Sequence, residues 1–181
     1  MTSVAEAPLK YLQGYPPATI AQVQQLIADE GLGAWLLGKY PNAHTLRTDR
    51  ALFEYVQAIK EDRLRGAEPL AKALFDSKLR VLAQALGTHS NIARVQGSKL
   101  KAKREIRVAS LFRDVPLEFL RMIVVHELAH FKERYHNRAF YQLCSHMEPH
   151  YAQLEFELRL YLTHLELTGK RLWGGTEAAT E

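Results

Sequence analysis

Apolar residues recur at helical spacing in the first part of the chain. Ile20, Val23 and Ile27 stand three and four residues apart, which predicts a helix with one apolar face. Gly31 supplies a stop signal for this helix. The glycines within residues 31–38 indicate a break in regular structure before the next apolar stripe.

A second helix is predicted after Thr48 and Asp49, which form a suitable N-cap, and it ends at Gly66. Its apolar face consists of Leu52, Phe53, Val56, Ile59 and Leu64. From Leu70 to Ser110 the apolar runs become short and partly alternating, with glycines and an asparagine between them. This stretch predicts three or four short antiparallel strands, including runs at residues 78–82, 92–95 and 105–109.

Helical spacing returns at Pro116 and predicts three further helices, over about residues 116–134, 138–147 and 151–168. Strands in the middle of the chain with helices on both sides are typical of the α+β class. We expect one domain over residues 19–173, with a helical part at 19–66, strands at 70–110 and helices at 115–168. The proline-containing residues 1–18 are expected to be an extended lead-in, and residues 174–181 a flexible tail.

Composition and charge exclude several classes of protein. With 47% hydrophobic residues, the 181-residue chain can bury a core of its own and is not typical of a disordered protein. No apolar run approaches the roughly 18 residues that cross a bilayer, and no targeting signal precedes the first helix, so we expect a cytoplasmic protein. A net charge of +4 does not favour a nucleic-acid partner. The one cysteine, Cys144, is expected to be a packed core thiol.

The chemistry of the chain is concentrated in the sequence HELAH at residues 126–130, an HExxH motif within the predicted helix 116–134. His126 and His130 lie about 40° apart around the helix axis and about 6 Å apart along it, so both imidazoles can bind one ion. Glu127 is rotated by about 100° from His126, where it can activate a water on the metal. This is the arrangement of the zincins. The surrounding residues are apolar, and buried histidines and a glutamate need polar or metal partners.

A catalytic zinc ion has three protein ligands and an open position. His136 is the first candidate for the third ligand, because Asn137 is a suitable N-cap for the next helix and would leave His136 in a turn. The alternatives are residues on the later helices: Glu148, Glu155, Glu157, His146 and His150. Four residues after the motif could stabilise an oxyanion, and the sequence alone assigns this role to none of them: Tyr135, Tyr141, Tyr151 and Arg138.

A basic run precedes the motif, with five cations in nine positions: Lys99, Lys101, Lys103, Arg104 and Arg107. Its simplest interpretation is a solvated strand or loop, and its functional interpretation is contact with phosphates or an acidic substrate.

Two sequence blocks resemble the YgjP-like small metallopeptidase-type proteins of bacteria, which are relatives of SprT-like zincins. The first is FLRMIVVHELAHFKERYHNRAFYQLCSHMEP at residues 119–149, and the second is RVQGSKLKAKREIRVASLF at residues 94–112; YLQGYP at residues 11–16 adds to them. One departure is RVQGSK, where the broader family usually has RWGSC. The resemblance implies a zincin-like fold with a small sheet over the HExxH helix. It also implies that His126, His130 and His136 bind one Zn²⁺ and that Glu127 is the catalytic acid/base.

Three functions follow as hypotheses. The leading one is zinc-dependent hydrolysis of a peptide or protein substrate, with Glu127 activating a zinc-bound water. An edge strand near residues 92–96 would hold an extended peptide. The second is hydrolysis of nucleoside triphosphates, UTP above all, because proteins resembling this branch are also described as pyrophosphohydrolases and the basic run could bind phosphates. The third is a non-catalytic module stabilised by zinc, which requires a fourth protein ligand.

Overall fold

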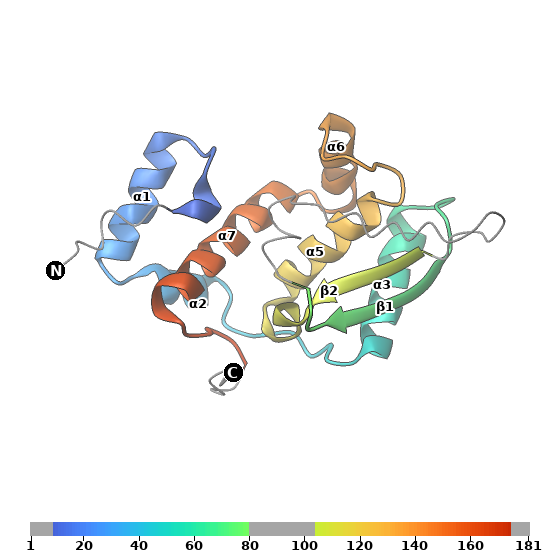
Figure 1. Ribbon diagram of the computed structural model, residues 1–181, viewed down its shortest axis with the longest axis horizontal. Helices are drawn as coiled ribbons and strands as arrows, with labels where there is room; N and C mark the ends of the chain where they lie inside the picture. The colour runs from blue at the N-terminus through green and yellow to red at the C-terminus, as the bar shows by residue number, and fades with distance from the viewer. Residues whose placement is uncertain (1–8, 80–103, 175–181) are drawn as a thin grey trace.

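The computed structural model describes residues 9–79 and 104–174, and Figure 1 shows their arrangement. The sheet and α3 lie at one end, α1 and α2 lie at the other, and α5 and α7 run between them. The elements in chain order are η2 (Lys10–Leu12), α1 (Pro17–Ala28), α2 (Leu32–Lys39), α3 (Asp49–Arg63), β1 (Leu70–Asp76), β2 (Arg104–Ala109), η3 (Ser110–Asp114), α5 (Leu117–Ala129), α6 (Arg138–Met147) and α7 (Tyr151–Thr168). The α+β class is confirmed.

The helix that contains HExxH lies in the middle of the core. Nine of the 13 residues of α5 are buried, because α5 packs against β2 on one side and against α6 and α7 on others. Apolar residues cover most of the circumference of α5, so this helix is stable only when other elements pack around it. The HExxH motif therefore lies on a rigid element of the core.

The described strands pair differently from the prediction. β1 and β2 form a parallel pair with Ala73 opposite Ile106 and Phe75 opposite Val108, so the expected antiparallel pairing is wrong. Parallel strands need a crossover of about a dozen residues or more, and residues 77–103 are long enough to provide one. The buried Ile106 and Val108 alternate along β2 and face the core.

The strand expected at residues 78–82 begins instead with a turn. The Asp76 carboxylate accepts a hydrogen bond from the backbone N–H of Lys78 at 2.8 Å, which turns the chain at the end of β1. The remainder of this run and the strand expected at residues 92–95 lie outside the described residues. The strand expected at residues 105–109 is confirmed by β2.

The glycine-rich segment 31–38 is not a break, since most of it forms α2. Gly33 lies directly against α7, where a Cβ atom would come within 2.9 Å of the His164 ring. Gly33 therefore allows α2 and α7 to pack closely. In the sequence alone, the same glycine indicates a break in a helix. The N-terminal lead-in also departs from the extended prediction, because Lys10–Leu12 forms a 3-10 turn with Tyr11 and Leu12 buried.

Two of the predicted helix starts are confirmed by their caps. The Thr48 hydroxyl accepts from the N–H of Ala51 at 3.1 Å, and the side-chain Oδ1 of Asn137 accepts from the N–H of Phe140 at 2.9 Å. The helices at 138–147 and 151–168 have the predicted bounds. Within the described residues, no helix has the length and apolarity to span a membrane.

Candidate metal centre

Three histidines meet at the end of α5. The Nε2 atom of His136 lies 3.2 Å from Nε2 of His126 and 3.1 Å from Nε2 of His130. Their ligand atoms all lie within 4.8 Å of one another, and this is the one such group of metal-binding side chains in the described ranges. His126 is buried, and His130 and His136 are half-buried, so the cluster opens toward solvent on one side.

His136 reaches the cluster because α5 ends earlier than predicted. The helix stops at Ala129, not near residue 134, and His130 is its C-cap. The chain then tightens, with the N–H of Phe131 bonded to the carbonyl of Leu128 at 3.0 Å. The next helix begins at the Asn137 cap, so His136 sits in the loop that returns toward α5.

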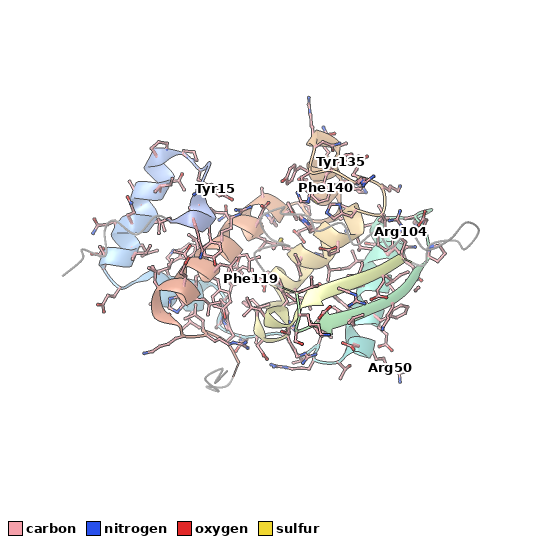
Figure 2. The ribbon with its side chains drawn as sticks, viewed as in Figure 1. Tyr15, Arg50, Arg104, Phe119, Tyr135 and Phe140 are labelled. Atoms are coloured by element: carbon pink, nitrogen blue, oxygen red, sulfur yellow. The ribbon has the colours of Figure 1, made fainter. Side chains whose placement is uncertain are left out.

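The ring of Phe140 packs against all three histidine rings. Its ring centroid lies 4.9 Å from that of His126, 4.7 Å from that of His130 and 4.6 Å from that of His136. Phe140 is fully buried on the first turn of α6, and Figure 2 shows it beneath the exposed Tyr135. The sequence analysis did not identify Phe140. Its position three residues after the Asn137 cap is the one feature of the sequence that could have placed it beside the loop that carries His136.

The outer ring nitrogens of two histidines have partners in the protein. Nδ1 of His130 lies 2.9 Å from the backbone carbonyl of Glu133, and Nδ1 of His126 lies 2.8 Å from the hydroxyl of Tyr151. A carbonyl oxygen can only accept, so His130 donates from Nδ1 and its Nε2 carries a lone pair. The Glu133 carbonyl is a backbone group, so the residue type at this position does not reveal its role. Tyr151 was a candidate for stabilising an oxyanion in the sequence analysis, and its contact with His126 was not predicted.

The donor set fits a small divalent cation. Three nitrogen atoms bound at 2.0–2.1 Å to a tetrahedral zinc ion stand about 3.3 Å apart, close to the two contacts of His136 Nε2. Each neutral imidazole has one ring nitrogen with a lone pair, so the three Nε2 atoms can together bind one cation at their centre.

Glu127 follows His126 on α5 and is half-buried, whereas His126, Leu128 and Ala129 in the same turn are buried. Its role as catalytic acid/base stays a prediction. The described part of the chain adds no fourth His, Cys, Asp or Glu to the three-histidine group.

The alternative third ligands lie elsewhere and have other partners. Glu148 pairs with Arg121, and Glu155 pairs with Arg159 at 2.8 Å. Glu157 is fully buried between Lys39 and the hydroxyl of Tyr40. His146 and His150 are exposed.

The remaining candidates from the sequence divide by burial. Cys144 is fully buried, and burial raises the pKa of its thiol to about 12, as expected for a core thiol. Tyr135 is 64% exposed and lies at the surface above Phe140 (Figure 2). Tyr141 is exposed, with its ring centroid 6.2 Å from that of His136. Arg138 opens α6 and is exposed.

Only the C-terminal part of the basic run is within the described residues. Arg104 pairs with Glu68 at 2.5 Å, and its guanidinium lies 5.5 Å from the ring centroid of Phe131, the residue after His130. Arg107 pairs with Asp76 at 2.9 Å and with Glu105 at 2.7 Å. Lys99, Lys101, Lys103 and the edge strand expected at 92–96 lie outside the described residues.

Comparison with known proteins identifies the family of this chain. The family model described as YgjP-like, metallopeptidase domain, matches residues 50–161. The chain belongs to the YgjP-like family. A YgjP-like relative from Escherichia coli strain K12, named UTP pyrophosphatase, is 57% identical over 159 residues, which are 88% of this chain and 95% of the relative. No solved structure matches the chain.

The family description and the relative's name both denote hydrolases, one of peptide bonds and the other of a phosphoanhydride. Membership of the YgjP-like family therefore supports hydrolytic chemistry for this chain. Together with the three-histidine cluster, it also supports dependence on a metal ion.

Proposed function

We propose that the chain is a zinc-dependent hydrolase that cleaves nucleoside triphosphates, UTP first among them, into a nucleoside monophosphate and pyrophosphate. The observation that carries the proposal is the 57% identity to the E. coli UTP pyrophosphatase over nearly the whole of both chains. Nucleotide hydrolysis, the second of the sequence hypotheses, therefore moves ahead of peptide hydrolysis.

His126, His130 and His136 are the residues that we expect to hold the ion. Three imidazoles suit zinc better than magnesium, which prefers oxygen ligands. When bound, zinc supplies a Lewis acid that acidifies water and polarises an oxygen of the substrate. The half-buried side of the cluster leaves room for water and substrate to approach.

Glu127 is proposed as the general base. Its carboxylate accepts a proton from the attacking water while the water oxygen forms a bond to the α-phosphorus. The bond between the α-phosphorus and the bridging oxygen breaks, and pyrophosphate leaves with the electron pair. Glu127 then releases the proton to solvent, so one water is consumed for each triphosphate.

Arg104 is proposed to contribute positive charge for the phosphates. It is at the start of β2 (Figure 2) and half-exposed, and its guanidinium lies 5.5 Å from the ring centroid of Phe131, the residue after His130. Its bond to Glu68 is at the surface, where an exposed ion pair contributes little and a triphosphate can compete. Arg107 is a weaker candidate because two carboxylates already flank it.

The test is release of pyrophosphate from UTP by zinc-loaded protein, with Glu127→Gln as the control. We expect metal-dependent pyrophosphate and UMP in equal amounts from the wild type, and a rate about 10²- to 10⁴-fold lower from the variant. Arg104→Gln is expected to raise KM with little change in kcat. Absence of metal-dependent pyrophosphate release from any nucleoside triphosphate would remove the proposal.

Peptide hydrolysis remains a second candidate, because the family is described as a metallopeptidase domain and HExxH with Glu127 as base suits amide cleavage. Mass spectrometry of a mixed peptide library after incubation with the same zinc-loaded protein distinguishes the two. Peptide cleavage that is lost in Glu127→Gln, without nucleotide turnover, would make the chain a peptidase. Retention of zinc with neither activity would favour the non-catalytic module.

A further inference from the structure

The three histidines are oriented by different kinds of partner. His130 is bonded through Nδ1 to a backbone carbonyl, and any side chain at Glu133 leaves that carbonyl in place. His126 is bonded through Nδ1 to the side-chain hydroxyl of Tyr151 at 2.8 Å. A hydroxyl can donate or accept, so this contact alone does not fix which nitrogen of His126 carries the proton.

The cluster decides the direction of this bond. Nε2 of His126 lies 3.2 Å from Nε2 of His136, inside the group that fits a cation, and a nitrogen that binds a cation must keep its lone pair. The ring proton of His126 is then on Nδ1, where the Tyr151 hydroxyl accepts it at 2.8 Å. Tyr151 is buried on the first turn of α7, so water does not compete for this contact.

We infer that Tyr151 is a positioning residue for the metal centre: its hydroxyl accepts from Nδ1 of His126, which leaves the lone pair of His126 on Nε2, facing the other two histidines. The inference rests on the proposed metal site. It assigns to Tyr151 the role that a carboxylate or carbonyl has behind most metal-binding histidines.

The geometry supports this role beyond the single contact. The rings of His126 and Tyr151 are nearly parallel, with an interplanar angle of 21° and a centroid distance of 6.4 Å. Phe140 also packs against His126, with a centroid distance of 4.9 Å and an interplanar angle of 75°. The imidazole is thus fixed by a ring contact with Phe140 and by the hydrogen bond to the Tyr151 hydroxyl, which selects its tautomer.

The first experiment measures zinc affinity by competition with a chromophoric chelator in wild type, Tyr151→Phe and Tyr161→Phe. Tyr161 is the matched control, because it is a fully buried tyrosine on the same helix, about 15 Å further along its axis, packed on Trp173. We expect Tyr151→Phe to lose affinity about 10- to 100-fold and to change the visible spectrum of bound Co²⁺. Tyr161→Phe should match the wild type.

The second experiment reads the tautomer directly by ¹⁵N NMR of the imidazoles in metal-free protein above pH 8. We expect the proton of His126 on Nδ1 in the wild type and a mixture of tautomers in Tyr151→Phe. A mixture of tautomers in the wild type would overturn the inference, as would unchanged zinc affinity in Tyr151→Phe or an equal loss in Tyr161→Phe. Wild-type protein that binds no zinc but keeps the Nδ1 proton would instead refute the metal site alone.

Discussion

Two buried polar groups lie along α7 and differ in what they require. Glu157 is fully buried and has three partners in the chain itself: Lys39, the hydroxyl of Tyr40, and the side-chain amide of Gln153 at 2.7 Å. Burial, and then the bond to Glu157, raises the pKa of Tyr40, so its hydroxyl stays protonated and donates to the carboxylate. This group is complete as folded.

The histidine cluster near the start of α7 is built in the opposite way. The outer nitrogens of His126 and His130 are bonded to the protein, and Nε2 of His136 lies 3.1–3.2 Å from Nε2 of the other two histidines. The Glu157 group joins α2 to α7, whereas the histidine cluster assembles α5, a loop and α6 around a central point. A polar group whose donors and acceptors match holds a fold together, and a group of converging acceptors indicates a ligand.

The largest expected effect tests the chemical side of this contrast. Glu127→Gln removes the base while keeping the shape of the side chain, so we expect kcat to fall by about 10²- to 10⁴-fold. Zinc content should stay at the wild-type level because Glu127 is not among the converging ligands. Turnover measured alongside elemental analysis checks both points, and a variant that retains its kcat would refute the assigned base.

Loss of the Glu157 carboxylate tests the structural side. Glu157→Ala leaves the buried hydroxyl of Tyr40 without its acceptor and opens a cavity, so we expect the free energy of unfolding to fall by about 2–4 kcal/mol. Chemical denaturation of the metal-free protein measures this loss. Zinc stoichiometry should not change, and a parallel loss of zinc would mean that the two groups are not separate.

The two confirmed helix caps provide a finer comparison. Asn137→Ala and Thr48→Ala should each cost about 1 kcal/mol of stability, because each removes one side-chain bond to a helix N-terminus. Asn137 directly follows His136, so only Asn137→Ala is expected to weaken zinc binding as well. Chelator competition on both variants tests this; equal affinities would show that the cap does not position His136.

The smallest effect concerns pH. Burial lowers the pKa of His44, whose Nε2 donates to the carbonyl of Phe112 at 2.7 Å and whose Nδ1 accepts from the N–H of Leu46 at 3.0 Å. The unfolded chain therefore takes up the proton first as pH falls. The stability that His44 contributes is complete above its unfolded pKa of about 6.5 and declines below it.

Unfolding curves of wild type and His44→Gln at several pH values check this prediction. The wild type should lose stability between about pH 7.5 and 5.5 more steeply than the variant, because the other histidines contribute equally to both proteins. Parallel curves for the two proteins would contradict it.

Local patterns made much of this structure predictable. The caps at Thr48 and Asn137 and the HExxH spacing depend on neighbouring residues, and each lies where the sequence indicated. Whether two strands are parallel or antiparallel depends on the path of the chain between them. The alternation of apolar and polar residues does not reveal that path, so the antiparallel prediction was wrong. The helix at residues 32–39 was missed because the reason for Gly33 lies on α7, more than 100 positions away. Phe140 acts through ring contacts that form only on folding, and the Glu133 carbonyl acts through a local turn that no side-chain pattern marks.

Zinc binding by wild type and His136→Ala tests the central claim most directly. The chelated, metal-free proteins are titrated with Zn²⁺ against a chromophoric competitor, and bound metal is counted after gel filtration. The account predicts one tightly held zinc ion per chain in the wild type and loss of tight binding in His136→Ala. Equal zinc binding by the two proteins, or none by the wild type, would contradict it.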